Sequence, residues 1–126
     1  MLTDVLGRYP EIIASWTVTQ LDREGPDLRL KASVLFKDGS QLHIRQVVLD
    51  GLLLKYAYQW QSENGELISR WDNAQHWPAI ATFPHHKHLV TNGEIMVLPS
   101  QGADLSLVME EIAAGMRNDR DRHDGN

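Results

Sequence analysis

Histidines are concentrated in one short part of this sequence, residues 70–88. This segment contains Arg70, Asp72, His76, His85, His86 and His88. Imidazole titrates near neutral pH and can accept or donate a proton, and a neighbouring carboxylate such as Asp72 fixes its tautomer. A guanidinium such as that of Arg70 stabilises negative charge that develops on a phosphate. These residue types therefore predict general acid–base chemistry as a first hypothesis.

The same histidines are open to two other interpretations. His86 and His88 are two residues apart, so they would lie on one side of an extended chain, and His76 or Asp72 would complete a metal site. The sequence lacks a recognised metal-binding motif such as H-E-x-x-H, and we expect neither a metal ion nor another cofactor. In the third interpretation, the histidines and Asp72 form a hydrogen-bond network that only holds the segment in shape.

The residues around these histidines predict a structured loop. Its expected framework is Trp71, Asp72, Asn73, His76, Pro78, Phe83 and Pro84. The prolines restrict the backbone and disfavour a helix, and the aromatic side chain of Phe83 is suited to hold the loop against the domain. Loops mounted on a rigid sheet often carry binding and catalytic residues. The sequence must therefore supply such a sheet.

Alternating apolar and polar residues dominate the first two thirds of the chain. Five runs have this period of two, which is typical of half-buried strands: residues 12–18, 28–36, 42–48, 52–60 and 67–71. Glycine-containing turn sequences separate these runs, and Asp38-Gly39 is a strong hairpin signal. Connections this short cannot form parallel crossovers. The sequence therefore predicts an antiparallel β-meander of about five to six strands.

Helical patterns flank the predicted meander. Leu105, Val108, Met109 and Ile112 have the spacing of the apolar stripe of a helix. Asp104 is the expected N-cap of this C-terminal helix and Gly115 its expected end. A short N-terminal helix is expected before Pro10. The prediction is one α+β domain over residues 1–116, with the helix packed on the sheet, and a disordered tail over residues 117–126, which lacks aliphatic side chains.

Composition excludes several classes of protein. The chain has no cysteine, which excludes thiolate nucleophiles and zinc–thiolate sites. No apolar run approaches the roughly 20 residues of a membrane span, and Met1–Asp4 lacks the start of a signal peptide, so we expect a cytoplasmic protein that does not bind membranes. The net charge of −5 argues against nonspecific coating of nucleic acid. Residues 27–60 are locally basic, however, and indicate a basic face on the sheet.

Three motifs in this sequence resemble those of the TumE-like proteins. They are Tyr56-x-Tyr58-x-Trp60, Arg70-Trp71-Asp72-Asn73-Ala74-x-His76-x-Pro78 and Thr82-Phe83-Pro84-His85-His86-Lys87-His88. The resemblance covers most of the chain and includes the turn at Asp38-Gly39. TumE-like proteins are toxin components of type II toxin–antitoxin modules, with the antitoxin encoded by a neighbouring gene. The resemblance therefore implies a prokaryotic toxin that arrests growth unless a protein antitoxin binds it.

The resemblance also suggests roles for individual residues. Many small toxins with a sheet-plus-helix layout cleave RNA without a metal ion. By this analogy, the expected catalytic residues are Arg70, His85, His86 and His88, with Arg70 stabilising the phosphorane and the histidines acting as acid and base. The expected substrate-binding residues are Arg45, Tyr58, Trp60 and Lys87. The aromatic pair would stack a base, although packing beneath the helix is favoured for these rings.

Two alternatives to an RNA-cleaving toxin stay open at this level. The protein would be a non-catalytic interaction protein if the histidines only brace the loop, or a small metal-binding protein if they hold an ion. An exposed edge of the meander would also allow a homodimer to form by strand pairing.

Overall fold

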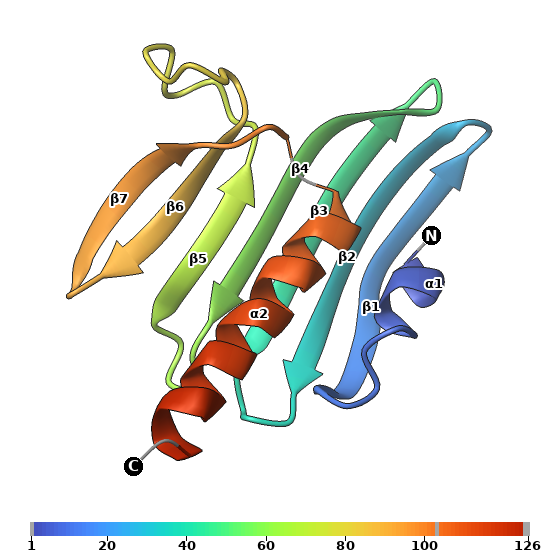
Figure 1. Ribbon diagram of the computed structural model, residues 1–126. Helices are drawn as coiled ribbons and strands as arrows, with labels where there is room; N and C mark the ends of the chain where they lie inside the picture. Colours follow the sequence, from blue (N-terminus) through green and yellow to red (C-terminus); the bar gives the residue numbers. More distant parts are fainter. Residues whose placement is uncertain (1, 103, 125–126) are drawn as a thin grey trace.

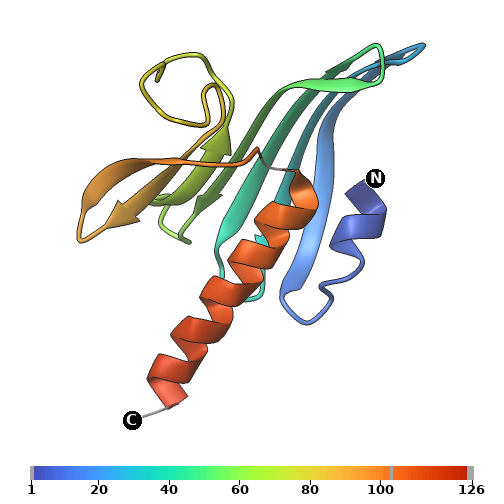
Figure 2. The same cartoon turned by 45° about the horizontal axis from the view of Figure 1, so that its top comes forward.

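A computed structural model describes residues 2–102 and 104–124 as a sheet with two helices on one face (Figures 1 and 2). The elements are α1 (Leu2–Leu6), β1 (Ile13–Glu24), β2 (Asp27–Phe36), β3 (Gln41–Leu49), β4 (Leu52–Gln61), β5 (Leu67–Asp72), β6 (His86–Thr91), β7 (Glu94–Pro99) and α2 (Leu105–Asp124). Each strand pairs antiparallel with the next in the order β1 to β7. The predicted α+β meander with a short N-terminal helix and a C-terminal helix is confirmed.

Within the described residues the sheet has seven strands, so the predicted count of five to six was too low. The missing hairpin is β6–β7, which begins within the segment that the sequence predicted as a loop. Polar residues at the start of β6 hide its alternation. The turn of this hairpin is Asn92-Gly93, and both residues have positive φ (52° and 80°). Asn-Gly is a strong signal for a two-residue hairpin turn, so the sequence did contain the information for this strand pair.

The core lies between the sheet and α2. Val108, Met109 and Ile112 of α2 have no exposed surface and pack on the apolar side of β2, β3, β4 and β5. The Asp104 side chain accepts a hydrogen bond from the backbone N–H of Leu107 at 2.9 Å, which confirms the predicted N-cap. Val5 and Leu6 of α1 complete the core cluster on this face.

The C-terminal helix continues beyond its predicted end. Gly115 lies inside α2, which extends to Asp124, so the predicted stop at Gly115 was wrong. A Cβ atom on Gly115 would lie 3.3 Å from the Trp60 ring, so the glycine allows close contact between helix and sheet. Disorder over residues 117–126 stays a prediction, and residues 125–126 of that tail lie outside the described residues.

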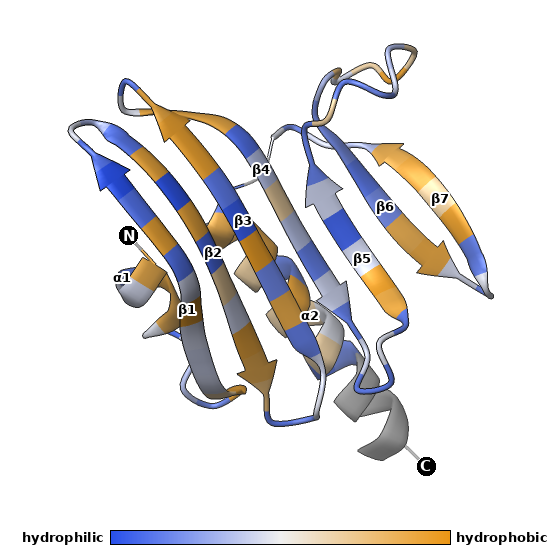
Figure 3. Ribbon diagram, turned by 180° about the vertical axis from the view of Figure 1, so that it is seen from behind, coloured by the Kyte–Doolittle hydropathy of each residue, from blue (hydrophilic) through white to orange (hydrophobic). Residues whose placement is uncertain are grey.

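The opposite face of the sheet is not covered by a helix in the described part of the chain (Figure 3). Alternation in β2, β3 and β4 places most of their polar residues on this face, which we call the open face. Arg45, His43 and Lys31 are exposed there, whereas their neighbours Ile44 and Ala32 are buried on the helix side. Among the described residues, no helix is long and apolar enough to cross a membrane.

Candidate functional site

Strands β5 and β6 bring the predicted arginine, aspartate and two of the histidines together. In the register of this pair, Arg70 lies opposite His88, and Asp72 lies opposite His86. Residues two apart in a strand point to the same face, so all four side chains lie on one side of the sheet, where Gln59 of the neighbouring β4 faces Arg70. The expectation that His86 and His88 lie on one side of an extended chain is confirmed.

Asp72 is at the centre of this group. Its Oδ1 lies 2.9 Å from Nε2 of His86 and accepts the backbone N–H of Ala74 at 3.0 Å. Its Oδ2 accepts the Nε–H of Arg70 at 3.0 Å and lies 3.6 Å from Nε2 of His88. Only 4% of Asp72 is exposed. One buried carboxylate therefore orients Arg70 and His86 by direct contact and has His88 nearby.

His86 is buried and has a protein group at each ring nitrogen. Its Nδ1 donates to the backbone carbonyl of Pro84 at 3.0 Å, because a carbonyl oxygen can only accept. Its Nε2 faces Asp72, and a hydrogen bond there requires a further proton between the two groups. The two side chains are thus in direct contact and are screened from solvent.

His88 is the more accessible of the two histidines, with 18% of its side chain exposed. Burial lowers its pKa below the usual 6.5, and the nearby Asp72 carboxylate opposes that shift only in part. Its ring centroid lies 4.9 Å from that of His86, and Trp77 contacts both rings edge-on at 6.2 and 6.4 Å. His88 is thus neutral near pH 7 and can accept a proton.

Arg70 lies beside His88 and is held from two directions. Its Nε–H donates to Asp72, and its Nη1–H donates to Gln59 Oε1 at 2.7 Å. Its side chain is 37% exposed, so the guanidinium also faces solvent on the open face. A fixed, partly exposed guanidinium beside a neutral imidazole is suited to bind a phosphate next to a base.

The loop between β5 and β6 is fixed by polar side chains at both of its ends. The Asn73 side chain accepts the backbone N–H of Tyr56 and donates to the backbone carbonyl of Leu54, at 3.0 and 2.9 Å. The Thr82 hydroxyl donates to the His85 carbonyl and accepts the N–H of Ser100. The predicted structured loop is therefore residues 73–85, and it includes the cis peptide bond Phe83–Pro84.

The other predicted loop residues are divided between the exposed loop and the buried strand β5. His76 and Pro78 are exposed on the loop, and Phe83 is 42% exposed. Trp71 belongs to β5 rather than to the loop, is buried in the core, and donates its Nε1–H to Glu111 of α2 at 2.7 Å. Trp71 was expected in the loop framework, but it instead joins the sheet to α2.

Four of the other predicted site residues lie on the helix side, apart from Arg70 and His88. His85 contacts Tyr56, with 2.8 Å between its Nδ1 and the tyrosine hydroxyl and with the two rings stacked. Lys87 pairs with Glu111 of α2 at 3.0 Å and lies over the Trp71 ring. Adjacent residues of a strand point to opposite faces, which is why Lys87 is separated from His86 and His88.

The two predicted stacking rings are also on the helix side. Tyr58 is fully buried beneath α2, and this burial raises its pKa to about 12, while Gln46 donates to its hydroxyl. Trp60 packs against the core and donates its Nε1–H to the Ser40 hydroxyl at 3.1 Å. Neither ring is on the open face, in agreement with the packing role that the sequence favoured. Of the predicted substrate-binding residues, only Arg45 lies on the open face.

Three of these residues could also hold a metal ion. Asp72, His86 and His88 each offer a ligand atom, and the three atoms lie within 4.8 Å of one another. Two imidazoles and a carboxylate are a common donor set for transition metals, and the bond from His86 Nδ1 to a backbone carbonyl is typical of metal-bound histidines. The exposed His76 is not part of this group. Of the two residues predicted to complete a metal site with His86 and His88, Asp72 is therefore close enough and His76 is not in the group.

A comparison with known families decides the class of the protein. The family model described as Toxin TumE matches residues 2–118, which is nearly the whole described chain. The chain belongs to the TumE toxin family. The predicted resemblance is confirmed, and membership implies a toxin with an antitoxin partner. No curated protein and no solved structure matches the chain.

Gln59 is the residue of this TumE-family site that sequence reasoning missed. It fixes the Arg70 guanidinium, yet in the sequence it stands between Tyr58 and Trp60 as one polar position of an alternating run. Its register partner is Arg70. The sequence shows only that Gln59 is on the polar side of β4. Its pairing with Arg70 becomes visible only in the fold.

Proposed function

We propose that this TumE-family toxin cleaves RNA by metal-independent acid–base chemistry on the open face, and that a protein antitoxin encoded nearby holds it inactive. The observation that supports the proposal is that Arg70 is hydrogen-bonded to the buried Asp72 and that His88 lies 3.6 Å from the same carboxylate, with exposed surface of both side chains toward the same side. An RNA target in a prokaryotic cell implies action in the cytoplasm.

His88 is the proposed proton-transfer group. Neutral His88 accepts the proton of a ribose 2′-hydroxyl, whose oxygen attacks the adjacent phosphorus. The bond from phosphorus to the 5′ oxygen then breaks, and protonated His88 returns the proton to that leaving oxygen. The products are a 2′,3′-cyclic phosphate and a 5′-hydroxyl. Asp72, 3.6 Å from His88, stabilises the protonated imidazole between the two steps.

Arg70 is the proposed electrostatic group. During the attack, negative charge increases on the phosphate oxygens, and the guanidinium donates hydrogen bonds to them. Gln59 and Asp72 hold Arg70 from two sides, so little reorganisation is needed as the charge develops. The His86–Asp72 pair acts as a positioning group, because it is buried and contacts the substrate only through its neighbours.

The toxin proposal is tested by inducing the gene alone and together with its neighbouring gene. We expect growth arrest and loss of intact RNA with the gene alone, and normal growth when both are expressed. In vitro, the purified protein should cleave RNA but not the same sequence with 2′-deoxyribose at each position, because the proposed nucleophile is then absent. Normal growth with the gene alone, or cleavage of the deoxy substrate, would contradict the proposal.

A non-catalytic interaction protein is the second candidate. It is favoured by the bonds of Asp72 and His86 to the backbone of Ala74 and Pro84, which brace the loop irrespective of any substrate. The two candidates differ in the effect of His88→Asn. This change should abolish growth arrest if His88 transfers protons, and should leave the arrest unchanged if the protein acts only by binding.

A further inference from the structure

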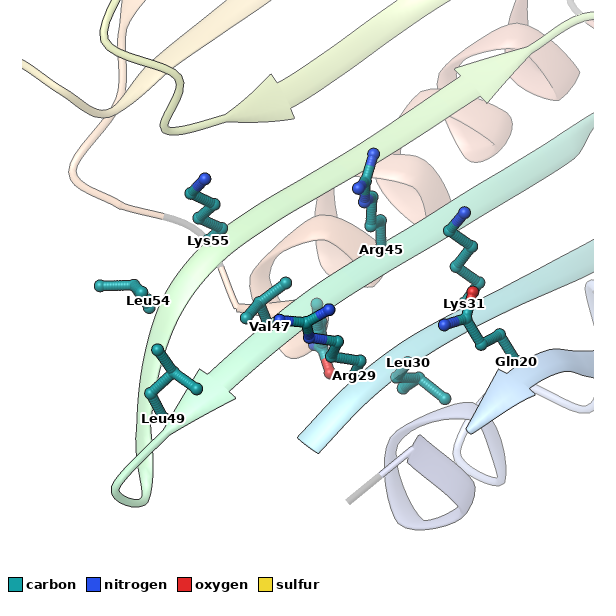
Figure 4. A pocket seen from close by; sticks show the side chains of 10 residues that line it. Gln20, Arg29, Leu30, Lys31, Arg45, Val47, Leu49, Leu54 and Lys55 are labelled. Carbon is teal, nitrogen blue, oxygen red and sulfur yellow. The ribbon is translucent and has the colours of Figure 1, made fainter. Parts of the chain in front are cut away.

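The open face has exposed cations beyond those of the site described above. Four of them come from three neighbouring strands: Arg29 and Lys31 of β2, Arg45 of β3 and Lys55 of β4. We call these four residues the basic strip. Figure 4 shows their side chains on one side of the sheet, and the register of β2 and β3 places Lys31 directly opposite Arg45.

Neighbouring acids form no close ion pair with the basic strip among the described residues. Within the described part of the chain, no ion pair shorter than 4.0 Å includes a residue of the strip. Asp22 is opposite Arg29 in the register, and its carboxylate accepts a hydrogen bond from Gln20 at 2.6 Å. Like charges directly opposite each other in a sheet are unfavourable. An anion bound between Lys31 and Arg45 would remove this repulsion.

The basic strip is continuous with the surface beside Arg70. One hollow in the open face is lined by all four residues of the strip. A second hollow is lined by Gln59 and Arg70, and both hollows include Lys31 and Arg45. A molecule that lies along the strip therefore reaches Arg70 without leaving the hollowed surface.

A small residue opens the connection between the strip and the site. In the register, Ala57 lies between Arg45 on one side and Asp72 on the other. Neighbouring strands are about 4.8 Å apart, so Arg45 and Asp72 are separated by roughly 10 Å with only a methyl group between them. A ligand chain has room to cross the sheet at this point.

We infer that the basic strip binds the sugar–phosphate backbone of single-stranded RNA and directs the strand to Arg70 and His88. The inference rests on the proposed function and specifies its substrate. Positively charged grooves that follow a backbone are characteristic of single-strand binding. His88 is recessed beside Trp77, so a flexible single strand reaches it more readily than a stiff duplex. The exposed Trp77, at 42%, is placed to contact a base beside the site.

The test is the affinity of the full-length protein for a fluorescent 2′-O-methyl RNA of about 12 nucleotides, a length within the usual range of such sites. This probe lacks the proposed nucleophile, so binding is measured apart from cleavage. The variant is Lys31→Gln/Arg45→Gln, and the matched control is Arg23→Gln/Lys37→Gln. Arg23 and Lys37 are exposed cations outside the strip, in β1 and in the β2–β3 turn.

The strip variant should bind roughly 20-fold more weakly than the wild type at 0.1 M salt, and the slope of log affinity against log salt should fall by about 1.4, since two phosphate contacts are lost. The control should bind like the wild type, and a duplex of the same sequence should bind more weakly. Ala57→Leu fills the connection without changing charge. It should slow cleavage of ordinary RNA while affinity for the methylated probe changes little.

The outcomes separate this inference from the proposed function. Cleavage by the wild type, with equal probe affinity for the strip variant and the control, would overturn the strip as the RNA site and leave the proposed function standing. If the wild type neither binds nor cleaves RNA, both fail. If the strip variant keeps its RNA affinity but no longer binds the antitoxin, the strip is a protein interface, and the RNA assignment is overturned.

Discussion

His86 and Asp72 form a buried pair across strands β5 and β6, with 2.9 Å between Nε2 and Oδ1 and with exposed fractions of only 1% and 4%. The pair joins the start of β6 to the end of β5. The other histidine in contact with Asp72, His88, is partly exposed. The proposed mechanism assigns proton transfer to His88, whereas the buried pair supports the fold, so substitutions within the cluster should have different consequences.

Asp72→Asn should destabilise the fold. An amide cannot replace the carboxylate toward both His86 and Arg70, and the loss of one member of a buried charged group costs about 3 kcal/mol. In a domain of this size, this corresponds to a decrease in Tm of roughly 10 °C. His86→Ala should act similarly, because it removes the other member of the same buried pair. Thermal unfolding followed by circular dichroism gives the measurement.

Asp50→Asn provides the control for Asp72→Asn. Asp50 is an exposed turn residue with positive φ, a conformation that asparagine tolerates, so its Tm should stay within about 2 °C of the wild-type value. Equal stability of Asp72→Asn and the wild type would show that the buried cluster does not support the fold.

Arg70→Ala and His88→Asn should abolish growth arrest while the protein stays folded. Both side chains are partly exposed, and a partly exposed ion pair such as Arg70–Asp72 contributes about 1 kcal/mol or less to stability. Growth after induction and the Tm of the purified variants are measured together. Lys37→Ala, an exposed cation away from the site, is the control and should keep full toxicity. Variants that unfold would instead show that Arg70 and His88 are structural.

Much of the fold is predictable from the sequence because it depends on local patterns. Alternation and glycine turns define the strands from Leu28 to Trp60, and Asp104 begins α2 as its spacing indicates. The end of α2 cannot be predicted from a local pattern. Gly115 does not end the helix, because it serves the close contact with Trp60 of the sheet. A glycine required by packing looks the same in the sequence as a glycine that ends a helix.

The composition of the site is predictable, whereas its geometry is not. Histidine clustering identified the segment, but His85, His86 and His88 are equivalent in sequence. Their separation follows from the position at which β6 begins and from its register with β5, which places His86 at Asp72 and leaves His85 at Tyr56. The same rule places Tyr58 and Trp60 on the helix side. Pairing register depends on contacts between distant residues, so it is not contained in any one segment.

The lowered pKa of His88 predicts how stability and activity depend on pH. Because burial weakens proton binding in the folded state, unfolded chains bind more protons between the lowered pKa and the usual 6.5. The contribution of His88 to stability is therefore complete above about pH 6.5 and is lost as the pH falls through the lowered pKa. Cleavage should decrease over the same acidic range, since protonated His88 cannot act as the base.

His88→Gln separates this effect from other titrations. Its stability, measured by urea unfolding between pH 5 and 8, should depend less on pH than that of the wild type. If the two proteins show the same pH dependence, then His88 titrates alike in the folded and unfolded states.

Removal of metal ions should leave RNA cleavage unchanged. In the proposed mechanism, Arg70 and His88 supply the charge stabilisation and the proton transfer, so dialysis against EDTA should not alter the rate. Elemental analysis of the purified protein should find less than stoichiometric metal. A stoichiometric transition metal that is lost in His88→Asn would instead place the ion on Asp72, His86 and His88, whose ligand atoms are close enough to bind it, and would replace the proposed mechanism with metal-assisted hydrolysis.

His85→Phe should retain full toxicity, because His85 lies on the helix side of the sheet, apart from Arg70 and His88. The substitution removes the contact between His85 Nδ1 and the Tyr56 hydroxyl but keeps an aromatic ring stacked on Tyr56, so the loss of stability should be about 1 kcal/mol. His88→Phe is the matched comparison and should abolish growth arrest. Growth after induction and the Tm are measured for both. A folded but non-toxic His85→Phe protein would place the reaction on the helix side of the sheet, and the assignment of the open face would fail.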